Sequence, residues 1–245
     1  RFLLVLGILT GMGLLSGSSL VAAAPSGMIT VTHVYTVSPT VIAVTIEAGE
    51  IIRGDTIVYK KQDGDRISRD GHQRWVLRND RFYGSLVGRD EKLVYTADRH
   101  VGDELDGKWA DARASYRISS SDDSTWHGAT SPVTVHRKTR PRDLGRVGPR
   151  HAWQFTATTE STVYLTVPKA LTVGCRYSVS FPGSALRAVE LVYSPAAVRS
   201  EAVHVSHLGF HPLDPAKVAF LSCWMGSGGG LNYREGLRFR VLSQP

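Results

Sequence analysis

The stretch VHVSHLGFHPLDPAKVAFLSC, residues 203–223, predicts two short strands joined by a stiff loop. Val203 and Val205 alternate with polar residues, which is typical of a strand with one buried face, and the apolar run 218–221 predicts a second, more buried strand. The loop contains three residues with special backbone preferences, namely Gly209, Pro212 and Pro215. Glycine readily adopts positive φ and proline fixes φ at about −65°, so few loop conformations are available.

This order of strand, glycine-aromatic turn, proline and strand resembles the opening of the immunoglobulin-like domain that precedes the catalytic barrel in family nine glycoside hydrolases, the cellulase-type enzymes. The matching residues are Val203, Val205, Leu208, Gly209, Phe210, Pro212, Asp214, Pro215, Lys217 and the strand 218–221. Ser206 and His207 depart from the family, which usually has asparagine and glutamine at these positions. The later segment RFRVL, residues 238–242, looks like the next strand of the same domain.

The resemblance implies that residues 201–245 begin a second, immunoglobulin-like domain, which is incomplete because such a sandwich needs roughly 100 residues. It also implies an intramolecular partner, a catalytic domain that carries the acid and the base and against which the immunoglobulin-like domain packs. Four residues are expected at that domain junction: Leu208, Gly209, Phe210 and Pro212. Any β-sandwich can contain this order of parts, so an unrelated function is the alternative.

The first 24 residues predict a cleavable secretory signal. Arg1 precedes an apolar run over residues 2–15, and three alanines at 22–24 supply a small-residue cleavage site, so the mature chain is expected to begin near Pro25. A transmembrane anchor is the less favoured alternative, because glycines and serines dilute the run and a span needs about 20 apolar residues. We therefore expect a secreted, periplasmic or extracellular protein with no membrane association after cleavage.

Charge and cysteine content exclude several classes of protein. The chain has 29 Lys and Arg against 22 Asp and Glu, a net charge of +7, and such a mild excess requires no nucleic-acid partner. Two cysteines, Cys175 and Cys223, exclude a disulfide-dense scaffold. We expect them in different domains, which favours free or buried thiols over a bridge, although their pairing stays open.

The chain from Met28 onward reads as strand after strand, without a convincing amphipathic helix of ten or more residues. Strands are predicted at 30–35, 41–46, 56–59, 92–95, 116–118, 133–136, 153–157, 162–167, 176–181 and 189–193, with a single helical turn near 109–112. This pattern predicts an all-β fold, an immunoglobulin-like β-sandwich in two domains with the second truncated. The first domain is expected over 28–198, with a linker at 195–200.

No catalytic or metal-binding residues can be assigned from spacing. The acidic segment 98–111 offers Asp103, Glu104 and Asp106 to a calcium ion, but it lacks the spacing of an EF-hand loop, so a solvated loop is preferred and no cofactor is expected. A glycosidase pair needs two carboxyl groups about 5–10 Å apart in a cleft, which nothing in this loop predicts. His204, His207 and His211 are interpreted as turn residues rather than zinc ligands.

Five aromatic residues could stack against sugar rings: Trp75, Tyr83, Trp109, Trp126 and Trp153. Trp109 and Trp126 are expected to be the most exposed of these and are the candidates for contacting carbohydrate, although large aromatic residues in a sandwich usually lie in its core or rim. The basic run 137–150 is predicted to be an exposed, solvated loop.

The function expected from the sequence is that of a noncatalytic N-terminal β-sandwich portion of a secreted carbohydrate-active enzyme, a glycoside hydrolase of the cellulase type. Its partners would be the catalytic domain and a polysaccharide. A stand-alone extracellular carbohydrate-binding or adhesion module is the alternative.

Overall fold

The computed structural model describes residues 28–126, 128–149, 154–197 and 201–233, and these are almost entirely β. The all-β prediction is thereby confirmed, and strands pair only antiparallel in every described sheet. The predicted signal at 1–24, the start of the mature chain near Pro25 and the expected strand at 238–242 lie outside the described residues.

A four-stranded sheet forms one layer of the sandwich. Its order is β1 (Ile29–Ser38), β2 (Val41–Ala48), β12 (Phe155–Thr166), β11 (Thr134–Arg146). Strand β2 is buried along nearly all of its length, because it is a central strand whose two faces are both covered. Its alternate side chains point to opposite faces, so Ile42, Val44 and Ile46 enter one core and Val41 and Ala43 enter another.

A three-stranded sheet, β10 (Arg117–Ser120), β13 (Arg176–Ser180) and β14 (Val189–Val192), forms the second layer. Its inward side chains, among them Ile118, Tyr177 and Val179, share one core with those of β2 and β12. The main core contains Ile42, Val44, Ile46, Tyr116, Ile118, Trp126, Val163, Leu165, Val167, Leu171, Tyr177, Val179, Phe181, Leu191 and Tyr193. This packing of two antiparallel sheets is the sandwich that the sequence pattern predicts.

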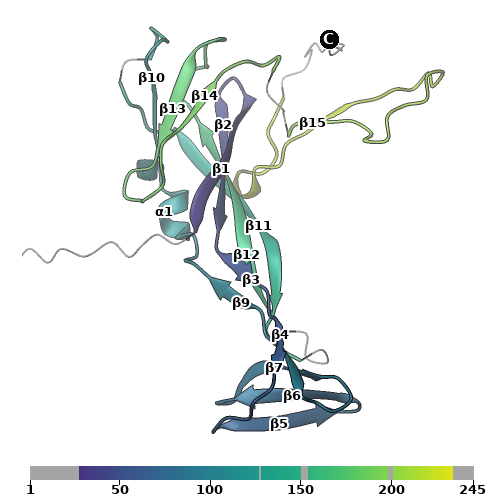
Figure 1. Cartoon of the computed structure of the whole chain (residues 1–245). Coiled ribbons are helices and arrows are strands. Elements are labelled where there is room, and N and C mark those ends of the chain that lie inside the picture. The colour runs from purple at the N-terminus through teal and green to yellow at the C-terminus, as the bar shows by residue number, and fades with distance from the viewer. Residues whose placement is uncertain (1–27, 127, 150–153, 198–200, 234–245) are drawn as a thin grey trace, which may run out of the picture.

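Residues 53–98 form a five-stranded antiparallel sheet beyond one end of the sandwich (Figure 1). Its order is β4 (Thr56–Val58), β8 (Leu93–Thr96), β7 (Arg81–Val87), β6 (Gln73–Arg78), β5 (Asp65–Asp70). The short pair β3 (Glu50–Ile52) and β9 (Arg99–Val101) connects this sheet to the sandwich. Only β4 and β8 overlap predicted ranges; β5, by contrast, is mostly charged, with the sequence DRISRD.

Strand β11 corrects the prediction of a basic loop at 137–150. The basic run as far as Arg146 continues β11, an edge strand, and Pro141 lies where its register with β12 shifts. Proline is tolerated at edges and bulges because no ladder hydrogen bond is lost there. Outward-facing arginines pair with acids of the neighbouring strands, as Arg140 does with Glu160 at 2.9 Å. Likewise, the two strands predicted at 153–157 and 162–167 form the single strand β12.

The predicted helical turn near 109–112 is confirmed as α1 (Gly107–Asp111), which is followed by the 3-10 turn η1 (Arg113–Ser115). Asp106 caps α1 by accepting a hydrogen bond from the Lys108 backbone N–H at 2.9 Å. A second 3-10 turn, η2 (Gly226–Gly228), lies near the end of the described chain.

The opening stretch forms a hairpin, β15 (Val203–His204) and β16 (Phe220–Leu221), that projects away from the sandwich (Figure 1). The prediction that 218–221 is a buried strand is wrong, since Val218, Phe220 and Leu221 are all exposed. Beyond the hairpin, pairing in residues 201–233 is limited to a bridge between Trp224 and Gly230. The start of a second, immunoglobulin-like domain at 201–245 therefore stays a prediction.

Candidate functional site

An open groove of about 830 Å³ lies on one face of the five-stranded sheet. Strand pairing aligns four of its lining residues in one row across β4, β8, β7 and β6: Thr56, Tyr95, Ser85 and Trp75. Directly paired residues of antiparallel strands point to the same face, so the row is fixed by register rather than by sequence proximity. Gln73 and Val87 line the groove two positions along the same strands.

Arg146, at the end of β11, reaches from the sandwich into this groove. Its guanidinium lies 5.0 Å from the ring centroid of Tyr95 and 5.4 Å from that of Phe82, and its Nη1 donates a hydrogen bond to Ser85 Oγ at 3.2 Å. Its Nη2 is buried without a hydrogen-bond partner in the described part of the chain. The residues that line the groove include no aspartate or glutamate. Of its two arginines, Arg74 forms an ion pair with Glu91, whereas Arg146 forms none within the described residues.

Asp98 holds the backbone of Arg146 in place. Its buried carboxylate accepts hydrogen bonds from the backbone N–H groups of Gly54 and Arg146, both at 2.8 Å, and from Arg53 Nη1 at 3.2 Å. Burial by itself would raise the pKa of Asp98, but these donors outweigh it and the pKa lies below its usual range. Asp98 thereby joins the end of β11 to the start of the five-stranded sheet.

A second cluster of polar groups anchors the hairpin to the sandwich. Glu201 accepts hydrogen bonds from Tyr164 Oη at 2.6 Å, from Lys138 Nζ at 2.7 Å and from Tyr35 Oη. Burial would raise the pKa of Glu201, but Lys138 and the two tyrosines hold it below its usual value. The Cys223 thiol also contacts Glu201 at 3.5 Å, and burial together with this carboxylate raises the pKa of Cys223 to about 11.

Apolar packing supports the same anchor. The outer face of the four-stranded sheet is covered by the chain on both sides of the hairpin, and this second core consists of Val37, Val41, Ala43, Tyr164, Ala202, Cys223 and Met225. Gly226 lies so close to β11 that a Cβ there would overlap the carbonyl of Arg137. The base of the hairpin is therefore firmly held, whereas its arm is not covered.

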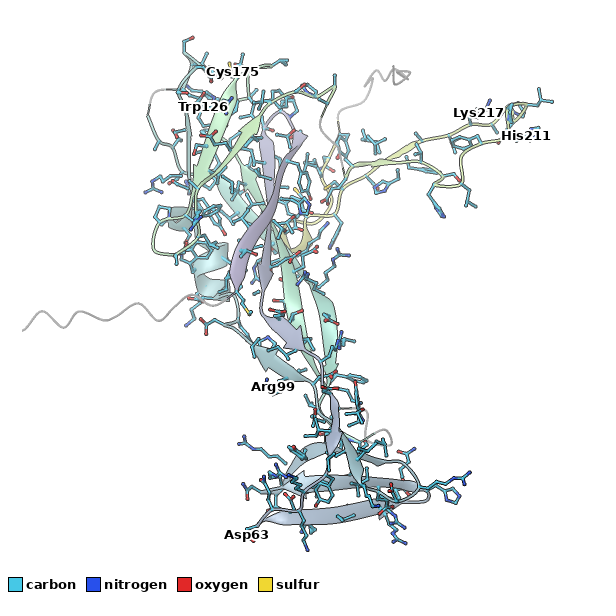
Figure 2. The ribbon with its side chains drawn as sticks, in the orientation of Figure 1. Asp63, Arg99, Trp126, Cys175, His211 and Lys217 are labelled. Atoms are coloured by element: carbon cyan, nitrogen blue, oxygen red, sulfur yellow. The ribbon has the colours of Figure 1, made fainter. Side chains whose placement is uncertain are left out.

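The projecting arm is apolar on its surface. The exposed fraction of Leu208 is 87% and that of Leu213 is 84%. The exposed apolar residues of the arm and its base are Val203, Val205, Leu208, Phe210, Leu213, Val218, Phe220, Leu221 and Trp224. His211 and Lys217 mark its far end, well away from the sandwich (Figure 2).

The structure places the four predicted junction residues, Leu208, Gly209, Phe210 and Pro212, together on this arm, and all four are exposed. Gly209 has a φ of +77°, as the loop was expected to require. Their role at a domain junction stays a prediction.

The expectation that Trp109 and Trp126 are exposed is wrong. Trp126 is only 6% exposed and packs edge-on against Tyr177, with ring centroids 5.3 Å apart. Trp109 is half-buried beside Tyr116 and Phe181, and its Nε1 donates to the carbonyl of Pro182 at 2.9 Å. Both rings belong to the sandwich core, because burial of a large aromatic surface outweighs the polar residues that flank them in sequence.

The acidic segment is not uniformly a solvated loop. Asp103, Glu104 and Asp106, the calcium candidates, are exposed, whereas Asp98 is buried and Asp111 pairs with Arg137 at 2.8 Å. No cluster of three or more potential metal ligands occurs within residues 28–126, 128–149, 154–197 and 201–233.

The histidines and cysteines of the sequence analysis lie apart from the groove. His204 Nε2 hydrogen-bonds the carbonyl of Ser222 at 2.9 Å, and His211 Nδ1 accepts from the Leu213 backbone N–H at 3.2 Å. Cys175 and Cys223 are both free thiols, as favoured. The described helices include none with the length and apolar character needed to span a bilayer.

Sequence reasoning missed the groove. Its lining residues come from four strands and from Arg146, which was assigned to a solvated loop, and only Trp75 had been noted as an aromatic residue. Comparison of the chain with protein-family models, with curated proteins and with solved structures finds no match.

Proposed function

We propose that this chain is the noncatalytic N-terminal β-sandwich portion of a secreted carbohydrate-active enzyme, and that its projecting hairpin docks a catalytic domain of the same polypeptide. The exposed hairpin carries this proposal. A two-stranded hairpin is at best marginally stable alone in water, and a contiguous apolar surface of this kind marks an interaction site. The residue pattern at 203–221, which resembles the start of the cellulase-type domain, supports a glycoside hydrolase as the parent enzyme.

The anchored base of the hairpin supports an intramolecular occupant. Glu201 and Cys223, on the two sides of the hairpin, both contact the outer face of the four-stranded sheet or its polar cluster. A partner that covers the arm would extend this existing apolar interface through Trp224 and Leu221, which are exposed next to it. Docking there would hold the partner against the sandwich.

The titration of the carboxyl groups supports a noncatalytic role. A glycosidase acid needs a raised pKa so that it is protonated at neutral pH. Where the pKa of a described carboxyl group is shifted, it is lowered, as for Asp65, whose hydrogen bonds from Arg78 bring its pKa to about 2. Reducing-sugar release from soluble cellulose, xylan and mixed-linkage glucan should therefore stay at background for the 245-residue chain.

The hairpin substitution Leu208→Ser tests the docking. In the longer polypeptide it should lower the free energy of unfolding by about 1–3 kcal/mol, because a leucine loses its buried contact. In the 245-residue chain the same substitution should have almost no effect. Val173→Ser is the matched control, an exposed apolar residue outside the hairpin. Equal effects of the two substitutions in the longer polypeptide would contradict docking, as would a gene that encodes no glycoside hydrolase domain after residue 245.

The groove on the five-stranded sheet favours a second candidate, a stand-alone extracellular carbohydrate-binding or adhesion module. Open grooves with a few convergent polar groups are the usual form of a ligand site. The reading frame after residue 245 separates the two candidates. Secretion, which both require, is tested by sequencing the N-terminus of the exported protein, which should begin near Pro25.

A further inference from the structure

The groove on the five-stranded sheet has features that the sandwich does not need. The sheet is an insertion between β3 and β9, and the main core of the sandwich includes no residue from it. The groove combines an apolar floor, to which Val87 and Trp75 contribute, with hydroxyl and amide groups of Thr56, Ser85 and Gln73. A ligand that fits must offer both C–H surface and hydrogen-bonding groups.

Arg146 determines the charge of that ligand. Within the described residues, no carboxylate forms an ion pair with its guanidinium, and its Nη2 is buried without a partner. A buried donor without a partner is costly and needs an explanation. Anionic oxygens, such as those of a carboxylate, form the strongest hydrogen bonds to a guanidinium and can accept two N–H groups at once. A sulfate group presents the same kind of anionic oxygens.

We propose that this groove binds an acidic oligosaccharide, with the carboxylate or sulfate of one sugar accepting hydrogen bonds from Arg146. The pyranose rings supply apolar C–H faces for the floor and hydroxyl groups for Ser85, Thr56 and Gln73. The volume of about 830 Å³ exceeds what a single inorganic anion needs and accommodates several sugar units. Asp98, which holds the Arg146 backbone, keeps the guanidinium in place. The inference does not depend on hairpin docking.

Titration calorimetry of the 245-residue chain tests the proposal with four probes: trigalacturonate, its methyl ester, a sulfated heparin disaccharide and cellotriose. At least one of the two acidic probes, trigalacturonate and the heparin disaccharide, should bind. The two neutral probes, the methyl ester and cellotriose, should bind at least about tenfold more weakly, since a hydrogen bond to a charged group contributes roughly 1.5–3 kcal/mol. The stronger of the two acidic probes identifies the anion as carboxylate or sulfate. Failure of both acidic probes at millimolar concentration, or equal binding of the neutral probes, overturns the proposal.

Two groups of substitutions locate the binding. Arg146→Gln should weaken the acidic probe about tenfold or more, whereas Arg140→Gln, on the same strand but outside the groove, should change it by less than about twofold at physiological salt. Gln73 is exposed at the rim, so Gln73→Glu should weaken binding and Gln73→Lys should strengthen it, with both variants folded.

The two Gln73 variants are expected to change the affinity for the acidic probe in opposite directions. They therefore test the site even if Arg146→Gln lowers the stability of the protein. If Arg146→Gln and Arg140→Gln lose equal affinity for the acidic probe, or if the two Gln73 variants bind it equally well, the binding is nonspecific attraction to a basic protein. Either result would overturn the proposed site. Leu208→Ser should leave binding unchanged, so a failure of hairpin docking is distinguishable from a failure of the groove.

Discussion

Asp98 is a residue whose burial cannot be predicted from the residues around it in the sequence. Its sequence neighbours include Thr96, Arg99 and His100, which predicts a solvated position. Its carboxylate is nevertheless buried and accepts hydrogen bonds from residues 44 to 48 positions away. Nothing in the local sequence indicates those donors, because the partners meet only once β3, β9 and β11 are assembled. The same is true of Arg146, whose groove neighbours Ser85 and Tyr95 lie far from it in the sequence.

Asp98→Ala should lower the free energy of unfolding by about 2–4 kcal/mol, since it leaves buried N–H groups of Gly54 and Arg146 unpaired. Denaturant titration measures this loss. Asp103→Ala is the control from the same acidic segment, and because Asp103 is exposed it should change stability by less than about 0.5 kcal/mol. Equal effects of the two substitutions would show that Asp98 does not join the sheet to the sandwich.

The contacts of Glu201 that hold the base of the hairpin on the sandwich should weaken in acid. Its pKa is lower in the folded protein than in the unfolded chain, so its stabilising contribution is present above the unfolded value of about 4.3 and is lost as pH falls through the folded pKa. The groups that face it are Lys138, Tyr35, Tyr164 and Cys223. Hydrogen exchange of residues 223–233 should accelerate below about pH 4 relative to pH 6, after correction for the intrinsic pH dependence.

Glu201→Gln is the control for that prediction. The amide cannot ionise, so the exchange of residues 223–233 should lose its acid dependence while other regions keep theirs. An unchanged acid dependence in this variant would assign the effect to another carboxyl group.

Whole strands were predictable where their side chains alternate between a core and a second environment. Strands β1, β2, β13 and β14 follow this pattern, and the expected ranges overlap the observed ones. Strands β5, β6 and β7 contribute to neither core of the sandwich, and β5 is in addition mostly charged, so none of them shows a clear alternation between a core and solvent. The start of β11 agrees with the strand predicted at 133–136, but the part from residue 137 is predicted as a loop, because its proline and arginines suit an edge strand with a bulge as well as they suit a loop.

The turn η2 fastens the chain after the hairpin to β11. Its first residue, Gly226, and Gly229, which follows the turn as its C-cap, form a matched pair for testing this element. Both have positive φ, at +64° and +69°, but only at Gly226 would a Cβ overlap neighbouring backbone. Gly229→Ala should cost about 1–3 kcal/mol, because φ of +69° with ψ of −155° is a conformation that essentially only glycine adopts. Gly226→Ala should cost more, because β11 must also move.

The Cys223 thiol reports on this movement. It is buried and its pKa is about 11, so it should react slowly with Ellman's reagent at pH 8. Gly226→Ala should speed that reaction several-fold and Gly229→Ala should not. Identical rates in the two variants would contradict the close packing of η2 on β11.

The described residues form a sandwich with two projections, the five-stranded sheet at one end and the apolar hairpin at the side (Figure 1). The fold class and the residues that form the hairpin could be predicted from local sequence patterns. The groove could not, because strand register brings its residues together from five separate strands. The exposure of the hairpin could not be predicted either, since its alternating valines suit a strand with one buried face.

Hydrogen exchange of residues 203–221 tests the docking of the hairpin most directly, by comparing the 245-residue chain with a longer polypeptide in which the proposed catalytic domain follows residue 245. The arm of the hairpin has few buried contacts, so its amides should exchange rapidly in the 245-residue chain. In the longer polypeptide a docked catalytic domain should slow their exchange at least about tenfold, with the sandwich strands unchanged. Equally rapid exchange in both proteins would contradict the proposal that the hairpin is a docking element.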